Sequence, residues 1–349
     1  MGLKRQVSAP RVPRLVTLGS DYSGLEPATT AMNRMGVSHK LVFASNTNPA
    51  CEKYIKHAHV PGKFFQDVLE RKPAEEEYVD IYVWTPPCTD FSRAGKREGI
   101  TGKSKCGLLI KKSLLFIKNK RPRIAIFENV PALVEKKFLK IAKGICKALK
   151  EMGYTVKSAI LNSSTYGVPQ SRRRLYITAI RKDGQRHDFQ WPKRLPSKAV
   201  SLESILDPKV ASDKPGALPK AKGQRKRAIS AFKAAYEKGT DPRKVPVMVD
   251  IDASEQYMTF GMGICKTITR ARGSVGGPWV STRSRRTTAN ELIKLMGYRP
   301  SEVPYKAAGI TDRQLGAMIG NGVVMPVMGR ILAEAMWSGG LVSAKPEFR

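Results

Sequence analysis

The sequence predicts an α/β protein with a mostly parallel, Rossmann-like sheet covered by helices on both faces, plus a small irregular second domain. Up to about residue 190, short apolar segments alternate with helix-like segments, as is typical of strands that are buried on both sides. From about residue 192 to 285 this periodicity weakens, and proline, glycine and basic residues accumulate. The first observation predicts the sheet, and the second predicts the smaller domain.

The elements of the sheet follow one another in a regular order. Strands are predicted at 14–19, 40–45, 79–84, 123–127, 155–161 and 175–180. Helices are predicted at 27–35, 49–57, 108–118 and 133–152. Pro49 suits a first helical turn, and Gly153 suits the end of the last of these helices.

The second half is less regular. Strand-like pieces occur at 245–251, 266–269 and 279–281, and helical patterns return at 288–296 and from 311 to 336. The segment 214–227 holds six basic residues and no acidic one. We expect it to form a basic loop, although a plain disordered linker would have the same composition.

Composition limits the classes of protein to be considered. The hydrophobic content of 41% is enough for a packed core, and no stretch is long and apolar enough to span a membrane. The formal net charge of +33 predicts attraction to polyanions, of which nucleic acid is the commonest, although unspecific stickiness remains an alternative.

The five cysteines include no C-x-x-C pair, and the four histidines do not cluster near them. This pattern argues against a zinc or other metal site and favours a reducing, intracellular setting.

Two motifs follow predicted strands in the first half. The turn 21–26 (DYSGLE) comes directly after the first strand, where a backbone can approach a ligand. An ordinary turn between a strand and a helix would have the same sequence pattern. The segment 84–92 (WTPPCTDFS) places Cys88 after two stiffening prolines, where ligands bind in open α/β folds. The glycine-rich cationic segment 93–107 favours ionisation of that thiol. A structural cysteine after a proline turn is the alternative.

Two further motifs carry charge. Glu128 ends another predicted strand, where partial burial would raise its pKa and allow it to act as an acid. In the run 170–174 (QSRRR), an extended chain would place Arg172 and Arg174 on one face, where two guanidinium groups can clamp an oxyanion or carbonyl. A loop carboxylate and a solvated basic strand are the respective alternatives.

In this order, Pro86-Pro87-Cys88, then Glu128-Asn129-Val130, then Gln170-x-Arg172-x-Arg174 resemble the motifs of the DNA (cytosine-5) methyltransferase family. The segments 22–24, 67–68, 287–297 and 320–323 resemble further family motifs. The resemblance covers about residues 14–190 and 282–335, and the middle matches only in position.

The resemblance implies S-adenosylmethionine as cofactor and a reaction that needs no metal. It implies that Cys88 attacks carbon 6 of a flipped-out cytosine, that Glu128 contacts ring nitrogen 3, and that Arg172 and Arg174 hold the base or its phosphate. The residues implied to bind the cofactor are Tyr22, Ser23, Gly24, Asn46, Asp67, Pro86 and Asn321.

The expected DNA contacts come from the cationic segment, the glutamine of the third motif and the basic second half. They are Ser92, Lys96, Arg97, Gln170, Arg270, Arg272, Arg283 and Arg285. The expected domains are a flexible basic arm (1–13), a catalytic and cofactor-binding domain (14–190), a target-recognition domain (191–285) and a segment returning to the catalytic domain (286–349).

The chain departs from the family pattern at three places. Asn46 stands where the family usually has an acidic residue for the cofactor ribose, which predicts weaker cofactor affinity. Glu26 replaces the second glycine of the cofactor turn, and Trp84-Thr85 replace the usual glycines before Pro86. None of these changes removes a catalytic group.

The resemblance implies a sequence-specific enzyme that acts on double-stranded DNA as a monomer. Without a large N-terminal regulatory region, we expect a bacterial, phage or viral enzyme of the cytoplasm, or of the nucleus in a eukaryotic host. It would be either an orphan or paired with a cognate restriction endonuclease. The alternatives are a tRNA cytosine-5 methyltransferase of the same fold and a catalytically weak DNA-binding homologue.

Overall fold

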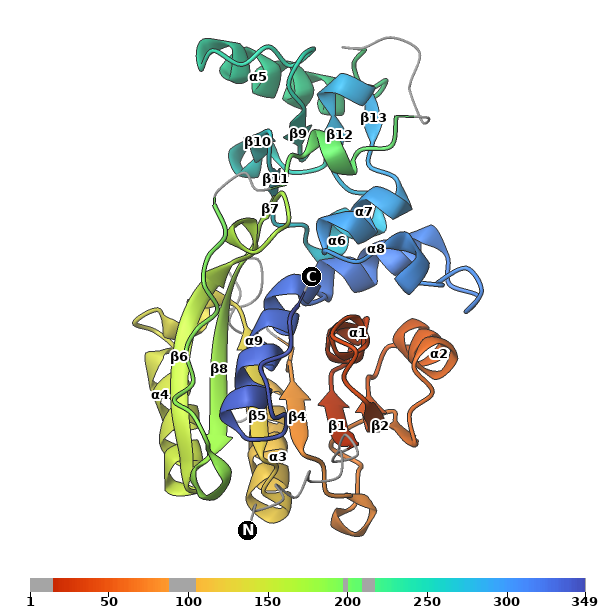
Figure 1. Cartoon of the computed structure of the whole chain (residues 1–349). Helices are drawn as coiled ribbons and strands as arrows, with labels where there is room; N and C mark the ends of the chain where they lie inside the picture. The colour runs from red at the N-terminus through yellow and green to blue at the C-terminus, as the bar shows by residue number, and fades with distance from the viewer. Residues whose placement is uncertain (1–14, 88–104, 197–199, 209–216, 349) are drawn as a thin grey trace, which may run out of the picture.

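Seven strands form one sheet in the order β3-β2-β1-β4-β5-β8-β6 in the computed structural model, which describes residues 15–87, 105–196, 200–208 and 217–348 (Figure 1). The strands are β1 (Val16–Asp21), β2 (His39–Ser45), β3 (Lys63–Phe65), β4 (Ile81–Trp84), β5 (Ile124–Asn129), β6 (Tyr154–Asn162) and β8 (Arg173–Arg181). Of the seven, β8 alone runs opposite to the other strands, and it pairs antiparallel with β5 and β6. The predicted mostly parallel sheet is confirmed.

The strand order reverses between β1 and β4. The chain runs outward from β1 to β2 and β3 on one side, and from β4 to β5 on the other. In open α/β sheets, ligands bind at the carboxyl ends of the strands where the order reverses. The residues that follow β1 and β4 therefore lie where a ligand site is expected.

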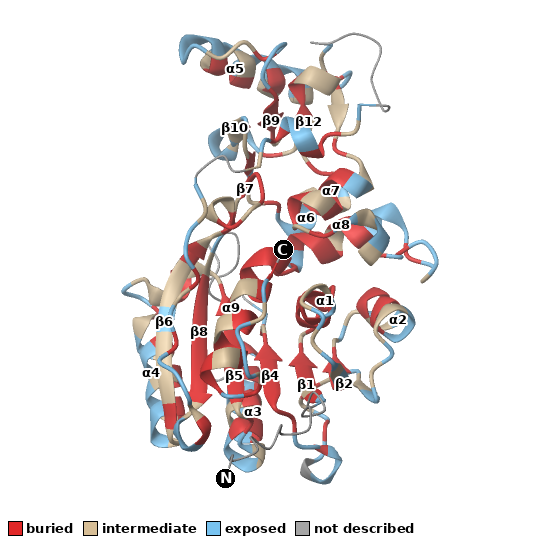
Figure 2. Ribbon diagram, viewed as in Figure 1, coloured by how far each residue is buried: buried red, intermediate tan, exposed pale blue. Residues whose placement is uncertain are grey.

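Helices cover both faces of the sheet because its central strands are apolar on both sides. Along β4, Ile81 and Val83 join one core cluster, while Tyr82 and Trp84 join the other. Figure 2 shows these central strands as buried. The first face carries α1 (Pro27–Arg34), α2 (Pro49–Ala58) and α9 (Met325–Ser338), and the second carries α3 (Lys105–Lys120) and α4 (Leu139–Glu151).

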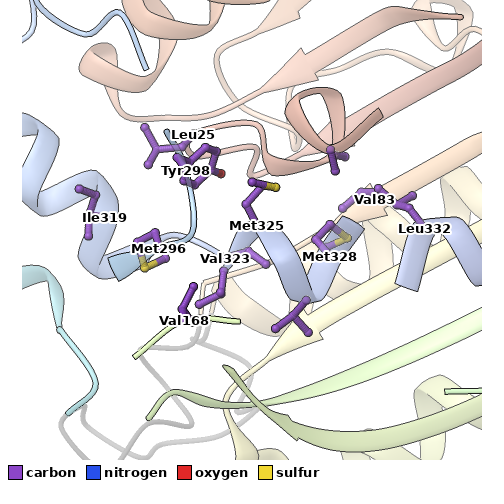
Figure 3. Packing of buried hydrophobic residues seen from close by; sticks show 14 of the residues in the cluster. Leu25, Val83, Val168, Met296, Tyr298, Ile319, Val323, Met325, Met328 and Leu332 are labelled. Carbon is purple, nitrogen blue, oxygen red and sulfur yellow. The ribbon is translucent and has the colours of Figure 1, made fainter. Parts of the chain in front are cut away.

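Helix α9 brings the C-terminal part of the chain back onto the sheet. Its Met325, Met328 and Leu332 are buried and lie in one cluster with Val83 of β4 and with Leu25 (Figure 3). Helix α9, which is about 300 residues away in sequence, therefore packs against the turn that follows β1.

The prediction of a single helix at 133–152 is wrong for its first residues. A 3-10 turn at Pro131–Val134 precedes α4, which begins only at Leu139. Leu133 and Phe138 are both buried. Residues five apart point about 140° away from each other on a continuous helix, so the break allows both side chains to enter the core.

A second, four-stranded sheet forms the smaller part of the molecule, in the order β10-β9-β12-β13. Its strands are β9 (Val247–Val249), β10 (Phe260–Met262), β12 (Trp279–Val280) and β13 (Arg285–Arg286). The helix α5 (Lys222–Glu237) packs a stripe of alanines, Ala228, Ala231 and Ala235, against this sheet. The basic loop expected at 214–227 is therefore helical from Lys222 onward, because this alanine stripe gives the helix a buried face.

The contacts that join the smaller part to the larger one include a strand pair and a helix crossing. The short strand β7 (Gln170–Ser171) pairs in parallel with β11 (Cys265–Lys266). The helix α6 (Arg270–Ser274) crosses α8 (Asp312–Asn321) with Gly273 against Gly316, and α7 (Ala289–Leu295) lies beside them (Figure 1).

Within the ranges described above, no single helix has the length and apolar character needed to cross a membrane. The bent pair α8 and α9 satisfies such a test together, by length and composition only.

Candidate active and cofactor-binding site

The turn after β1 is held by hydrogen bonds to the end of β2. The Ser23 hydroxyl donates to the Ser20 carbonyl oxygen at 2.8 Å, and its backbone N–H donates to the Ser45 carbonyl oxygen at 3.0 Å. Gly24 has φ +60°, and a Cβ placed there would meet its nearest atom, the Tyr22 carbonyl oxygen, only at 3.9 Å. The backbone of this turn therefore leaves open space at the edge where ligands bind.

The Tyr22 and Glu26 side chains each form a hydrogen bond to a helix. The Tyr22 hydroxyl donates to the Leu109 carbonyl oxygen of α3 at 3.2 Å. Glu26 has φ 52°, and its wholly buried carboxyl group accepts a hydrogen bond from the Thr29 hydroxyl at 3.2 Å. Burial raises the pKa of Glu26 to about 7, and hydrogen bonds from neighbouring hydroxyls lower it by less.

Asn46 and Asp67 lie after β2 and β3, at the same edge as the turn. The Asn46 side-chain oxygen accepts from the Asn48 backbone N–H at 2.9 Å, and an Asp67 carboxylate oxygen accepts from the Leu69 N–H at 2.9 Å. Both side chains are partly exposed. Together with the open turn, these polar groups fit the ribose and adenine of an adenosyl cofactor.

The next strands carry the residues expected to act on the base. The Asn129 amide donates to the Pro86 carbonyl oxygen at 3.0 Å, which ties the end of β5 to the chain leaving β4. Cys88 follows Pro87 directly but lies outside the described residues, as do Ser92, Lys96 and Arg97.

Glu128 and Arg174 form a buried pair on adjacent strands. Arg174 Nε lies 3.1 Å from Glu128 Oε1, and the two side chains are 14% and 9% exposed. Burial raises the pKa of Glu128, and the guanidinium groups of Arg174 and Arg172 oppose that rise. The direction of this pKa shift agrees with the expectation from the sequence, and the role of Glu128 as an acid stays a prediction.

Arg172, like Arg174, acts electrostatically on Glu128, but its guanidinium group is bound by backbone carbonyl oxygens. Its guanidinium donates to the carbonyl oxygens of Ile268 (2.8 Å), Gly320 (3.0 Å) and Gly322 (2.6 Å). It thereby connects the Gln170-x-Arg172 motif to the two residues on either side of Asn321, which is exposed at the end of α8. The role expected for Arg172 toward the base stays a prediction.

Gln170 does not face a ligand. Its side chain is wholly buried, its amide donates to the Leu295 carbonyl oxygen at 2.9 Å, and its oxygen accepts from the Ile268 N–H at 3.4 Å. The DNA contact expected of Gln170 is therefore corrected: this side chain joins the two parts of the molecule.

The expected DNA-binding arginines fall into two groups. Arg270 is exposed at the start of α6. Three others are paired with acids: Arg272 with Asp250 at 2.8 Å, Arg283 with Glu203, and Arg285 with both oxygens of Glu291 at 2.8 and 2.9 Å.

Arg285 is held by its pair with Glu291. Its side chain is 14% exposed and its partner Glu291 is wholly buried, so it stabilises the start of α7. The DNA contact expected of Arg285 stays a prediction.

The sequence interpretation missed two residues at this edge, Asp21 and Arg71. They form a wholly buried ion pair beside the turn that follows β1. Asp21 is the first residue of the turn 21–26 quoted above, where it was given no role of its own, and Arg71 belongs to no recognisable pattern, so no sequence signal joins them.

A cavity of about 440 Å³ lies elsewhere, between α7, α8 and the segment 303–307. Its lining includes Asp207, Thr288 and Asp312, and none of the residues discussed above. Because none of the predicted site residues lines this cavity, we do not identify it as the active site.

Comparison with known proteins agrees with this geometry. The model of the family described as C-5 cytosine-specific DNA methylase matches residues 20–337. The type II methyltransferase M.Bsp6I of Bacillus sp. (strain RFL6) is 28% identical over 271 residues, which cover 76% of this chain and 81% of that protein.

The type II methyltransferase M.MspI of Moraxella sp is 28% identical over 295 residues, or 84% of this chain and 64% of that protein. The chain therefore spans less than two thirds of the length of M.MspI.

The crystal structure of the Dnmt2 methyltransferase of S. pombe superposes with a TM-score of 0.66 at 16% identity, over 92% of this chain and 98% of that one. This likeness shows the fold. The family match, which spans all the motifs in order, shows more: the chain belongs to the C-5 cytosine-specific DNA methylase family.

Proposed function

We propose that this protein methylates carbon 5 of cytosine in double-stranded DNA, with S-adenosylmethionine as methyl donor and Cys88 as nucleophile. The Glu128–Arg174 pair carries the proposal, because it places an acid of raised pKa one strand away from the segment that leads into Cys88. The hydrogen bond from Asn129 to Pro86 fixes these two segments relative to each other.

Carbon 5 of cytosine is a poor nucleophile, and the proposed residues address that problem. The Cys88 thiolate forms a bond to carbon 6, and the electron pair of the 5,6 double bond moves toward carbon 5 and the ring. Glu128, whose pKa burial raises, donates a hydrogen bond to ring nitrogen 3 in its protonated form and so stabilises the charge that develops there. Arg174 orients the Glu128 carboxyl group.

When bound, S-adenosylmethionine would supply an electrophilic methyl group on a sulfonium, which carbon 5 accepts. Tyr22 to Gly24, Asn46, Asp67 and Asn321 are the residues proposed to hold it. A base then removes the carbon 5 proton, the bond between sulfur and carbon 6 breaks, and Cys88 leaves as a thiolate. These groups cannot reach a stacked base, so the cytosine must be flipped out of the duplex.

We assign target recognition to the smaller part of the molecule, residues 191–285, and cofactor binding and catalysis to residues 14–190 together with 286–349. The exposed basic residues of α5 and α6 support this assignment, because they suit phosphate contacts on duplex DNA. The recognition sequence depends on which side chains reach base edges in the groove.

Tritium transfer from labelled S-adenosylmethionine tests the proposal. Wild type and Cys146→Ser, which changes a half-buried thiol of α4, should label duplex DNA equally, and Cys88→Ser should label none. Equal labelling by Cys88→Ser would refute the nucleophile, and labelling of tRNA in place of DNA would refute the substrate. Bisulfite sequencing of DNA from an expressing host would then give the target site.

A further inference from the structure

A buried ion pair lies under the proposed cofactor turn. Asp21 is the last residue of β1, and Arg71 follows four residues after Asp67. Two guanidinium nitrogens of Arg71 donate to the two carboxylate oxygens of Asp21, at 2.9 and 3.0 Å, and both side chains are 0% exposed. This two-point geometry fixes orientation as well as distance.

The Asp21 carboxylate also accepts hydrogen bonds from two other strands. The Ser45 hydroxyl at the end of β2 donates at 2.7 Å, and the Tyr82 hydroxyl of β4 donates at 2.5 Å. The Ser45 oxygen in turn accepts from the Tyr22 backbone N–H at 3.4 Å. One carboxylate therefore connects the cofactor turn, the strand that precedes Asn46, and the segment that contains Asp67.

Arg71 is itself held in place from several sides. Its guanidinium lies over the rings of Phe43, Phe65 and Phe116, at 4.9, 5.3 and 5.1 Å from their centroids. Its backbone carbonyl accepts from Lys112 Nζ at 2.6 Å. A planar, stacked guanidinium makes contacts that an ammonium cannot reproduce.

We infer that the Asp21–Arg71 pair is a positioning device for the adenosyl cofactor. It sets the spacing between the Tyr22–Gly24 turn, Asn46 and Asp67, which lie on three different segments of chain. These segments would otherwise be free to move apart at the edge of the sheet. This inference rests on the proposed function, since it concerns the same cofactor site.

Calorimetric titration with S-adenosylhomocysteine tests the inference without depending on turnover. Arg71→Lys keeps the charge but loses the two-point geometry, and we expect it to weaken binding about tenfold or more. Affinity for duplex DNA should stay within about twofold, and the KM for S-adenosylmethionine should rise while kcat at saturation is retained.

Arg34→Lys is the matched control. Arg34 makes a similar two-point pair with Glu302, at 2.6 and 2.5 Å, at the end of α1 remote from the turn. It should lower thermal stability without weakening S-adenosylhomocysteine binding. Equal loss of binding in both variants would overturn the inference, because ion-pair loss anywhere would then suffice.

Arg71 Nε also lies 3.6 Å from Glu76 Oε1, and the Glu76 side chain is buried. The triple variant Asp21→Leu/Arg71→Met/Glu76→Gln therefore removes all three charges of this cluster together, and so gives a folded protein if the single variant does not fold. It should also bind S-adenosylhomocysteine more weakly than wild type, because the connections to Ser45 and to the Asp67 segment are gone. Wild-type affinity in this variant would overturn the positioning role alone. A wild-type protein that binds no S-adenosylhomocysteine would overturn the proposed function as well.

Discussion

At the scale of single residues, Glu128 shows how burial and neighbouring cations act in opposite directions on one carboxyl group. Removal from water raises its pKa, while Arg174 and Arg172 stabilise its charged form. The result is an acid that is more easily protonated than an exposed glutamate. This is the state needed to donate a hydrogen bond to ring nitrogen 3.

Glu128→Gln keeps the shape of the side chain but removes the titrating proton. We expect kcat for DNA methylation to fall by about 10²-fold or more. Steady-state kinetics on duplex DNA measure this, with Glu151→Gln on the exposed end of α4 as control. A kcat equal to that of wild type would remove Glu128 from the mechanism.

Glu26 gives a prediction about stability and pH. Its pKa is raised to about 7 in the folded protein by burial, from an ordinary value of 4.5. The folded state therefore binds the proton more tightly. The stability this contributes is complete below pH 4.5 and is lost as pH rises toward 7.

Between pH 5 and 8 the loss should reach about 2–3 kcal/mol in wild type relative to Glu26→Gln, which cannot ionise. Urea denaturation of the two proteins at both pH values measures it. If the difference between their unfolding free energies does not change with pH, Glu26 does not titrate as described.

The residues at the site could be predicted only where they carry a family pattern. Glu128 and Arg174 were predicted, and they lie together. The Asp21–Arg71 pair joins residues 50 positions apart and depends on strand order, which no local pattern contains. Gln170 was predicted to contact DNA from a short motif. Its burial depends on hydrogen bonds to Leu295 and Ile268, which are distant in sequence and which the motif does not reveal.

At the scale of elements, the crossing of α6 over α8 shows how the two parts of the molecule are joined. A Cβ on Gly316 would come within 2.0 Å of the Gly273 carbonyl oxygen, so the helices touch through backbone. Larger residues at either position would push the helices apart and displace α8, which ends at Asn321.

Gly316→Ala is therefore expected to lower the unfolding free energy by about 1–3 kcal/mol through overpacking. Gly144→Ala on α4 is the control, because a Cβ there meets nothing within 4 Å. It should raise stability by up to about 1 kcal/mol through helix propensity. Chemical denaturation compares the two, and equal effects would contradict the close crossing.

Strands with continuous apolar character were predicted well, because burial on both faces leaves a clear signal in sequence. The helix α5 was missed because its first turn is basic, and because its buried stripe consists of alanines rather than large apolar residues. The division of 133–152 was missed because it depends on Leu133 and Phe138 both reaching the same core cluster.

At the scale of the whole molecule, the sequence has a net charge of +33, and the described residues form two main sheets of different character. The large sheet places the proposed chemistry at its carboxyl edge, and the small sheet carries α5 at the far end of the molecule (Figure 1). Lys222 and Lys233 of α5 are exposed, so they are suited to contact phosphates beyond the target base.

Neutralising both lysines, in Lys222→Gln/Lys233→Gln, should reduce the slope of log K against log salt by up to about 1.8. Lys143→Gln/Lys147→Gln removes the same charge from exposed positions on α4, and should change the slope much less. Titration of labelled duplex DNA across a salt series measures both. Identical slopes would place DNA elsewhere on the surface.

The central claim is that Cys88 attacks carbon 6 of cytosine in DNA. The most direct test uses duplex DNA with 5-fluorocytosine at the target site and S-adenosylmethionine. After methylation, carbon 5 holds fluorine where a proton should leave, so the sulfur–carbon bond cannot break and the adduct persists. Mass spectrometry of the intact protein should show one covalently bound DNA strand in wild type and Cys146→Ser, and none in Cys88→Ser. An adduct in Cys88→Ser, or none in an active wild-type protein, would contradict the account.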